Sequence, residues 1–444
     1  MKIAIVGGGS YQWAPMLLRD IALEPALAGA RVVLYDIAPE PLALVGRWAE
    51  RLNQALPQPL TVETTTDRAT ALAGADVVIL SIAVGGLEAM RHDLEIPLRY
   101  GIVQTVGDTV GPGGLSRALR HIPVVVDLVR AMAQLCPDAW LLNLTNPMSA
   151  LCRAAARAGW RRVIGLCHEL FGTLRIISEL LAVPESHLQV NVAGINHFIW
   201  ILGLWVDGQD AWPRLRAAIA QATPPDLSHL PPERRPFADR RLIKFALFQT
   251  YGALPAAGDR HLAEFFPFFL GPHADAGRRY GVEVTTIEHR QRLRAALRAR
   301  LERQIAGEEP IPLTPSREEV APILAAIRQR RPSVHIMNLP NRGQVANLPP
   351  EVVVETLGVV DGATARGLAA GDLPPAIHSL VARHVVTQEL TVEAALRGDR
   401  NLARQALLND PLVTDFARAD ALLDDLLQAH RAYLPQFFDR AVVQ

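Results

Sequence analysis

The sequence is poor in cysteine, in net charge and in long apolar runs. Its three cysteines, Cys136, Cys152 and Cys167, form an odd, sparse set that argues against a disulfide framework and indicates a reducing compartment. Lys plus Arg equals Asp plus Glu at 45 each, so no excess charge would attract nucleic acid or an anionic membrane surface. No run approaches the about 18 apolar residues of a membrane span, and the first run is too short for a signal peptide. We therefore expect a cytoplasmic protein without nucleic-acid or membrane partners.

The first third of the sequence alternates apolar runs with amphipathic stretches. The 444 residues are 50% hydrophobic, which allows two domains or one large α/β unit. Strands buried on both faces of a parallel sheet typically read as near-continuous apolar runs, and such runs occur at 2–6, 31–36, 76–83, 139–145 and 161–167. Amphipathic stretches between them, such as 39–56 and 114–136, predict helices. The order predicts an α/β fold with a Rossmann-like, doubly wound parallel sheet over residues 1–170.

The pattern changes after about residue 170. Residues 188–208 alternate in a way that favours an antiparallel hairpin, whereas residues 212–240, rich in Pro, Arg and Asp, are expected to be exposed. Residues 281–330 and 388–436 read as helical. We predict a second, mixed α+β domain over residues 171–444, which carries substrate and oligomer contacts.

The N-terminal strand runs directly into a glycine turn, VGGGS. Gly7 and Gly9 match the first two glycines of G-x-G-x-x-G, with Ser10 in the same turn, while Gln12 occupies the place of the third glycine. Such a turn lets a pyrophosphate approach a helix N-terminus. Asp36 ends the second strand, where an acid accepts hydrogen bonds from the ribose and repels a 2′-phosphate. The pattern predicts NAD binding; the alternative is a plain turn beside an exposed aspartate.

A second group of polar residues lies at the end of the strand in RRVIGLCHELF. Cys167, His168 and Glu169 follow the apolar run directly, and Asn196 and His197 come later in GINHF. Thiol, imidazole and carboxylate side chains are common metal ligands. The carboxyl ends of parallel strands are where open α/β sheets bind their ligands. A core cysteine and a hydrogen-bonded histidine are the alternative, and spacing alone leaves that choice open.

Several motifs together resemble one family. VGGGS, DTVGPGG, NLTNP, the strand that ends in cysteine, GINH and NLPNRGQVANLP are similar to glycoside hydrolase family 4. The resemblance implies a nucleotide domain like that of lactate and malate dehydrogenases, together with NAD and a divalent metal, usually manganese. It also implies hydrolysis by redox elimination: oxidation at sugar carbon 3, proton removal at carbon 2, and loss of the aglycone from the resulting enolate. The family is an exception to the two-carboxylate scheme of glycosidases.

The resemblance also implies roles for individual residues. Cys167 and His197 match the two protein ligands of the metal, and Asn146 and Asn196 match residues that contact the sugar. His168 matches the general acid; its alternative role is support of Cys167.

The base falls in the segment YGALPAAGDRH. Asp259 is the preferred residue there, with Tyr251 and His261 as rivals.

The tetrad Cys-His-Glu-Leu at residues 167–170 resembles the CHEV form of the α-galacturonidases and departs from it at Leu170. The expected substrate is therefore an α-galacturonide or oligogalacturonide, bound near Glu169; α-galactosidase, α-glucosidase and α-glucuronidase activities are the alternatives within the family. A uronate carboxylate needs a cationic partner. Arg260 is preferred over the other arginines in or near these loops, namely Arg342, Arg117, Arg120 and Arg91.

Two rival classes share the fold. One is a metal-free, NAD-dependent hydroxy-acid dehydrogenase, and the other is a non-catalytic nucleotide sensor. The resemblance further implies a homo-oligomer, a dimer or a tetramer.

Overall fold

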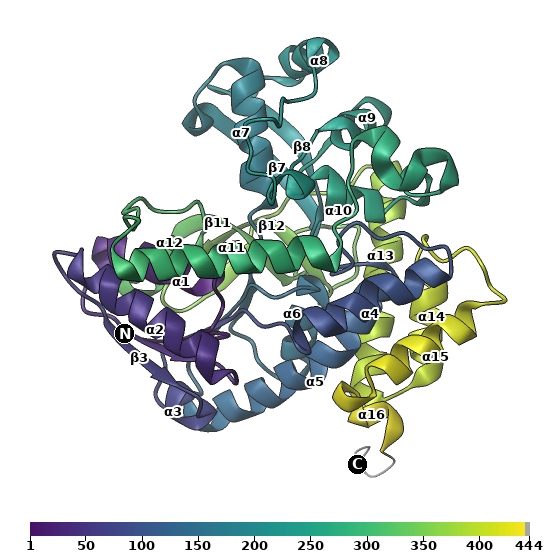
Figure 1. Ribbon diagram of the computed structural model, residues 1–444. Coiled ribbons are helices and arrows are strands. Elements are labelled where there is room, and N and C mark those ends of the chain that lie inside the picture. Colours follow the sequence, from purple (N-terminus) through teal and green to yellow (C-terminus); the bar gives the residue numbers. More distant parts are fainter. Residues whose placement is uncertain (440–444) are drawn as a thin grey trace.

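The computed structural model describes residues 1–439, which form one continuous mixed sheet flanked by helices (Figure 1). Six parallel strands make the first half, in the order β3-β2-β1-β4-β5-β6. This is the strand order of dinucleotide-binding sheets, so the predicted doubly wound fold is confirmed. The strands are β1 (Lys2–Val6), β2 (Arg31–Tyr35), β3 (Thr61–Thr65), β4 (Val77–Leu80), β5 (Trp140–Asn143) and β6 (Val163–Gly165).

The central strands form because their side chains are apolar on both faces. In β1, Ile3 and Ile5 pack into one hydrophobic cluster, whereas Ala4 and Val6 pack into another on the opposite face. This division follows from the two-residue period of a strand. β3 was not predicted, because its sequence TVETT alternates polar residues at the exposed edge of the sheet.

Helices cover both faces of the parallel half. The cluster with Ile3 includes residues of α1 (Trp13–Leu23), α2 (Pro39–Gln54) and α12 (Val320–Gln329). The opposite cluster includes residues of α5 (Gly111–Leu135), α6 (Met148–Arg157) and α13 (Pro375–Arg397). The remaining helices of this half are α3 (Arg68–Leu72), α4 (Gly86–Arg99) and α7 (Glu169–Leu181). Helices from the end of the chain therefore complete the layers of its beginning.

The second half of the sheet is antiparallel and joins the first half edge to edge. β7 (Leu188–Ile195) and β8 (Phe198–Val206) form the predicted hairpin. β11 (Ser333–Pro340) and β12 (Val353–Val360) lie between β6 and β7, and Asn338 of β11 pairs with Gly165 of β6. The short strands β9 (Gln209–Asp210), β10 (Leu254–Pro255) and β13 (Ala365–Gly367) extend this half.

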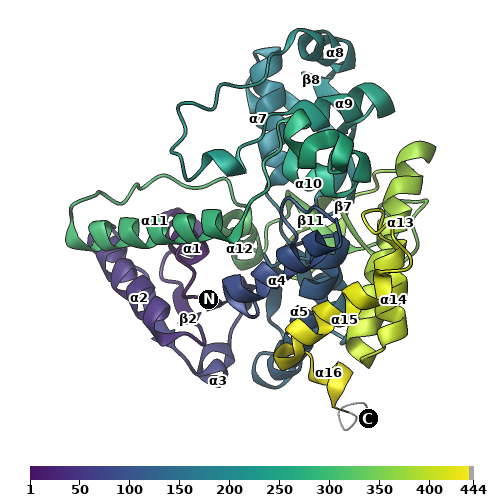
Figure 2. The ribbon, with the colours of Figure 1, turned by 45° about the vertical axis from the view of Figure 1, so that its right-hand side comes forward.

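The other helices surround this core. α8 (Trp212–Gln221), α9 (Leu242–Tyr251) and α10 (Asp259–Glu264) lie with α7 at the top of Figure 1, and α11 (Ile287–Ala306) crosses the front towards α2. α13, α14 (Arg400–Asn409) and α15 (Ala419–Ala429) group with α5 (Figure 2), followed by α16 (Pro435–Phe438).

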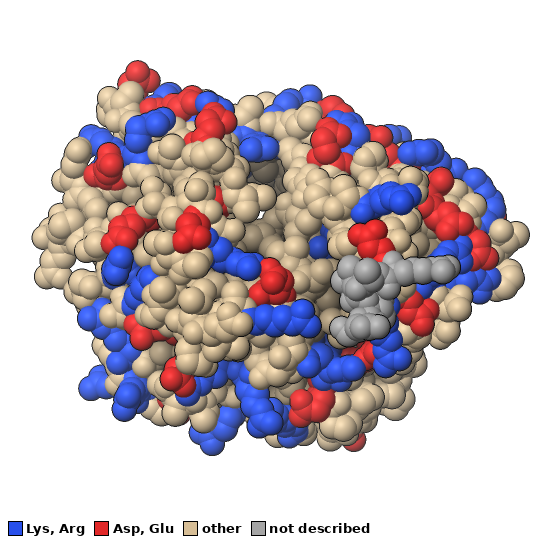
Figure 3. Space-filling view, turned by 90° about the horizontal axis from the view of Figure 1, so that it is seen from below, with Lys and Arg blue, Asp and Glu red and all other residues tan. Residues whose placement is uncertain are grey.

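Acidic and basic side chains are interspersed on the face seen in Figure 3, in keeping with the balanced composition. Within residues 1–439, no helix has the length and apolar character needed to cross a bilayer.

Candidate active site

The glycine turn after β1 is pressed against the ends of β4 and β2. Gly7 has φ +97°, and a Cβ on it would lie 1.9 Å from the Ser81 carbonyl oxygen, so only glycine fits. The Gly7 backbone N–H donates to the Tyr35 carbonyl over 2.9 Å. Ser10 Oγ accepts from the Trp13 backbone N–H at 3.1 Å, which fixes its hydroxyl at the start of α1. The turn therefore brings the N-terminus of α1 to the carboxyl ends of β1 and β4, the usual place for a phosphate.

Asp36 lies at the tip of β2, facing this turn. Its Oδ2 accepts from the Gly9 N–H at 2.9 Å and its Oδ1 from the Ala38 N–H at 3.0 Å. A carboxylate oxygen has two lone-pair sites, so each oxygen keeps the capacity to accept one more hydrogen bond. The geometry fits the predicted acid that receives ribose hydroxyls.

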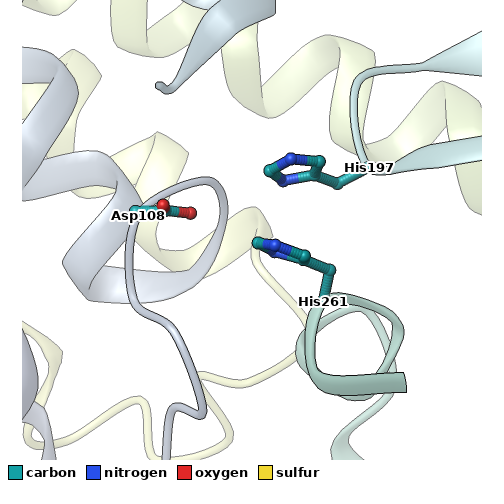
Figure 4. Close-up of side chains that lie close together, drawn as sticks. All are labelled: Asp108, His197 and His261. Carbon is teal, nitrogen blue, oxygen red and sulfur yellow. The ribbon is translucent and has the colours of Figure 1, made fainter. Parts of the chain in front are cut away.

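Three side chains from separate elements meet in front of the strand ends. Asp108 comes from the loop before α5, His197 from the β7–β8 turn and His261 from α10, and one ligand atom of each lies within 4.8 Å of the others (Figure 4). The two imidazole rings lie in contact, with centroids 3.7 Å apart and planes tilted by 31°. A carboxylate oxygen and two imidazole nitrogens form a donor set that suits a divalent cation such as manganese.

Hydrogen bonds fix which nitrogen of His197 is free. Thr109 Oγ lies 2.8 Å from His197 Nδ1 and donates to Asp108 Oδ1, also over 2.8 Å. A hydroxyl has only one proton to donate, so His197 Nδ1–H must donate to Thr109. The lone pair on His197 Nε2 therefore remains available, in the arrangement that supports a metal-ligating histidine.

Burial keeps both imidazoles neutral. It lowers the pKa of His197 to about 3 and that of His261 to about 4, and the attraction of Asp108 offsets this only in part. For Asp108, burial alone would raise the pKa, but His261, His197 and Arg117 outweigh it and hold the pKa well below its usual range. The site is therefore an ionised carboxylate beside two uncharged nitrogen donors.

Cys167 lies two residues beyond the end of β6, and it is not a member of this three-residue group. It is buried, at 8% exposure. Burial raises the pKa of the thiol, and the carboxylates of Glu355 and Glu169 raise it further. Without a cation, the raised pKa favours the protonated thiol. A cation beside the sulfur would favour the thiolate instead, because the thiolate is the form that binds metals.

The two predicted sugar-binding amides have unused hydrogen-bonding atoms. Asn196 is 1% exposed, and neither its Oδ1 nor its Nδ2 has a partner among residues 1–439. Asn146 Nδ2 donates to Asp108 Oδ2 at 3.4 Å, while its buried Oδ1 has no partner in the described chain. Buried unpaired amides are rare in native structures, so this pair indicates a ligand with hydroxyl groups.

His168 and Glu169 lie beside the group of Asp108, His197 and His261. His168 Nδ1 is 3.3 Å from Glu318, and this contact raises the pKa of the imidazole to about 9. Glu169 Oε2 accepts from the Gly258 N–H at 2.6 Å, and its Oε1 lies 4.0 Å from His261 Nε2. His168 is therefore cationic at neutral pH, and Glu169 connects the end of β6 with the start of α10.

The structure gives Asp259 another role. It is 2% exposed, and its two oxygens accept the backbone N–H groups of Ile243 and Lys244 at 3.1 and 2.9 Å, which stabilises the N-terminus of α9. Tyr251 packs edge-on against Trp200, 5.6 Å between centroids. This geometry favours a structural role for Asp259 over the predicted base, and it leaves His261 as the rival that lies at the site.

Most of the proposed carboxylate-binding arginines are engaged elsewhere. Arg120 pairs with buried Asp93, Arg91 with Glu95 and Glu288, and exposed Arg342 with Glu351. The Arg117 Nε donates to the Asn146 carbonyl at 2.9 Å. Arg260, next to His261, remains near the site.

Sequence reasoning did not identify Asp108 as a site residue. It lies in the DTVGPGG loop, where the density of polar residues and glycines was the available signal.

The sheet order and the glycine turn define an enzyme fold that binds a dinucleotide, with a polar, metal-compatible site at the carboxyl ends of its strands. The model of the family 4 glycosyl hydrolases matches residues 2–183, and that of the family 4 glycosyl hydrolase C-terminal domain matches residues 192–413. The chain belongs to this family.

Similar proteins act on several glycosides. An α-galacturonidase of Bacillus subtilis is 37% identical, over 96% of this chain and 97% of its own length. An α-galactosidase of the same species is 31% identical over 98% of this chain and 99% of its own.

Solved structures share the whole fold. A Bacillus subtilis protein provisionally described as a glucosidase matches with a TM-score of 0.89 and 37% identity, over 96% of this chain and 99% of its own. The 6-phospho-β-glucosidase of Thermotoga maritima, solved with manganese, NAD+ and glucose 6-phosphate, matches with a TM-score of 0.81 and 24% identity, over 98% and 99% of the two chains.

Proposed function

We propose that the protein is an α-galacturonidase that depends on NAD and a divalent metal, manganese being preferred. The observation that carries the proposal is the meeting of Asp108, His197 and His261, with Glu169 of the Cys167-His168-Glu169 segment 4.0 Å from His261. Full-length identity of 37% to an α-galacturonidase supports the substrate. The departure from the CHEV tetrad does not weaken this, because Leu170 is 2% exposed and packs in the core against β7 and β8.

The residues fit both cofactors. The tight turn at Gly7 and Gly9 and the carboxylate of Asp36 would hold NAD, and His197 Nε2, Asp108 and Cys167 would hold the cation, with His261 beside them. When bound, NAD exchanges a hydride with the sugar, and the cation withdraws electrons from the sugar oxygens that it contacts.

The chain's own groups orient the sugar. The free amide atoms of Asn196 and the free Oδ1 of Asn146 can exchange hydrogen bonds with sugar hydroxyls. Fixed polar groups of this kind hold the reacting carbons in one position without further reorganisation.

Two histidines move the protons. His168, cationic and beside Glu318, would protonate the leaving glycosidic oxygen. His261 is neutral, and its Nδ1 has no partner within residues 1–439, so it can accept the proton from carbon 2. Glu169, 4.0 Å from His261 Nε2, would stabilise the imidazolium that results.

A panel of nitrophenyl α-glycosides tests this function. We expect release of nitrophenol from the α-galacturonide at least about tenfold faster than from the α-galactoside, α-glucoside or α-glucuronide, and only with both NAD and manganese present. Preference for the α-galactoside would assign the chain to that activity instead. Turnover that persists after removal of either cofactor would exclude the redox route. Net formation of NADH from a hydroxy acid would favour the dehydrogenase alternative.

A further inference from the structure

Two arginines beside the site are partly buried and have no acidic partner among the described residues. The Nε atoms of Arg260 on α10 and Arg290 on α11 are buried and unpaired. In the part of the chain that the structure describes, no carboxylate lies within 4.0 Å of either guanidinium, although many surface arginines have one. Burying a charged donor without a partner costs free energy. A bound anion would lower this cost, so the two arginines indicate an anion-binding position.

Both guanidiniums are fixed against the loop that leads to Asp108. Arg260 donates to Thr285 Oγ1 and to the Thr105 carbonyl at 3.4 Å, and Arg290 donates to the Val106 carbonyl at 3.4 Å. Both also lie over the ring of Phe237, with Cζ 5.0 and 6.0 Å from its centroid. Both cations therefore lie against the same aromatic ring and the same loop, next to the site.

The buried acid near these arginines is held by backbone groups through one oxygen. Glu264 is 0% exposed, and its Oε1 accepts the N–H groups of Val106 and Gly107 at 2.7 and 2.8 Å, while its Oε2 has no hydrogen-bond partner among residues 1–439. Asp108 faces the two histidines (Figure 4) and accepts from Thr109. Both carboxylates favour the charged guanidiniums through space, but neither forms an ion pair within 4.0 Å of Arg260 or Arg290.

The two positive charges also disfavour each other. Burial and the charge of Arg260 together lower the pKa of Arg290 to about 10. A bound carboxylate would offset both the burial of the two charges and their mutual repulsion, since a guanidinium can bind a carboxylate through two parallel hydrogen bonds.

We propose that Arg260 and Arg290 together bind the carboxylate at carbon 6 of the uronide and so determine the choice of a uronide over a neutral glycoside. The assignment of the ligand rests on the proposed function. The proposal adds Arg290 to the residues that bind the uronate carboxylate. It leaves out Arg117, whose Nε donates to the Asn146 carbonyl. A neutral sugar, with a hydroxyl at carbon 6, would leave both guanidiniums without an anionic partner. The free-energy cost of these unpaired charges sets the size of the preference for a uronide.

The test compares Arg260→Met, Arg290→Met and the double variant with wild type. Arg292→Met is the matched control, since Arg292 is an exposed arginine on the same helix. Calorimetry measures the dissociation constants of free galacturonate and galactose, and kinetics measure kcat/KM for the corresponding nitrophenyl glycosides. We expect each single variant to bind galacturonate about 10- to 100-fold more weakly, with galactose changed less than about threefold, because a hydrogen-bonded charge contributes roughly this factor. Arg290→Lys should recover part of the loss.

Equal losses for both sugars, or no loss for either, would overturn the arginine assignment while leaving uronide hydrolysis by the wild type intact. Conversely, arginine-dependent binding of galacturonate by a wild type that hydrolyses no uronide would leave the arginine site standing and remove the proposed function. Should a methionine variant misfold, shown by a lost circular dichroism signal, Arg260→Lys and Arg290→Lys replace it. Selectivity unchanged in both lysine variants would then contradict the proposal, since lysine lacks the planar fork.

Discussion

A buried ion pair below the site offers the sharpest test of the packing. Asp93 on α4 and Arg120 on α5 are both 0% exposed, and Arg120 Nη1 donates to Asp93 Oδ1 at 2.8 Å. Arg120 Nε donates to the Val84 carbonyl at 3.0 Å, and His430 Nε2 lies 3.1 Å from Asp93 Oδ1. Asp93→Leu would leave the guanidinium buried without a counter-charge, which costs about 3–5 kcal/mol.

The size of this effect can be converted to a melting temperature. At about 2.1 cal/mol/K per residue, the unfolding entropy of a 444-residue chain is about 0.9 kcal/mol/K, so 1 kcal/mol corresponds to roughly 1 °C. Asp93→Leu should therefore lower Tm by about 3–5 °C in scanning calorimetry. The double variant Asp93→Leu/Arg120→Met should lose less than Asp93→Leu alone, because it removes the unpaired charge as well.

An exposed pair supplies the control. Arg298 and Glu302 on α11 are about half exposed and 2.9 Å apart, and Glu302→Gln should change stability by less than about 0.5 kcal/mol. The reasoning would be refuted if Asp93→Leu lost no more stability than Glu302→Gln, or if the double variant were less stable than Asp93→Leu.

The buried pair of Asp93 and Arg120 also makes the stability depend on pH. Burial alone would raise the pKa of Asp93, but the hydrogen bond from His430 and the charge of Arg120 lower it overall. A lowered folded-state pKa means that the stabilisation is present above the unfolded value of about 3.9 and is lost as the pH falls below it. The difference in Tm between wild type and the double variant should therefore shift in favour of the double variant below about pH 4.

Four further substitutions test the site. Gly7→Ala places a Cβ against the Ser81 carbonyl and should abolish detectable NAD binding in calorimetry; retained affinity would refute the role of this turn. Cys167→Ser should weaken manganese binding, measured by titration, by at least about tenfold with an unchanged circular dichroism spectrum, and full metal binding would remove its role as a ligand. His168→Gln should reduce turnover of a methyl uronide about 10²- to 10⁴-fold but that of the nitrophenyl uronide far less, since a good leaving group needs little protonation; equal losses would argue for a supporting role. Asp259→Ala should lower the free energy of unfolding by about 1–2 kcal/mol with kcat changed only severalfold, whereas a large loss of kcat at unchanged stability would restore it as the base.

The parallel half of the fold could be predicted because its signals are local. Ile3 to Val6 and Val77 to Leu80 are apolar without interruption, and each run is followed by a turn or a helical stretch. The central antiparallel strands were harder to predict. β11 contains Asn338 and leads into a polar loop, so its sequence resembles a loop and becomes a strand only through its pairing with β6 and β12.

The site was predictable where residues follow a strand end closely, as Cys167 does. Asp108 could not be assigned, because its partners His197 and His261 come from elements far along the chain. Arg290 was hidden for a related reason: it lies on a helix with many charged residues, where sequence alone does not show which arginine turns inward.

The position of β11 and β12 between β6 and β7 constrains how the protein is made. β6 ends at Gly165, and its antiparallel neighbour on that side begins only at Ser333. During synthesis, the edge of β6 therefore stays open until about 170 further residues have left the ribosome, since long-range pairing waits for its partner. A fragment ending at residue 170 would carry this open edge permanently, and unpaired edges promote association with other chains. The nucleotide half, although its sequence looks self-contained, should thus be obtained in soluble form only together with the segment that contains β11 and β12.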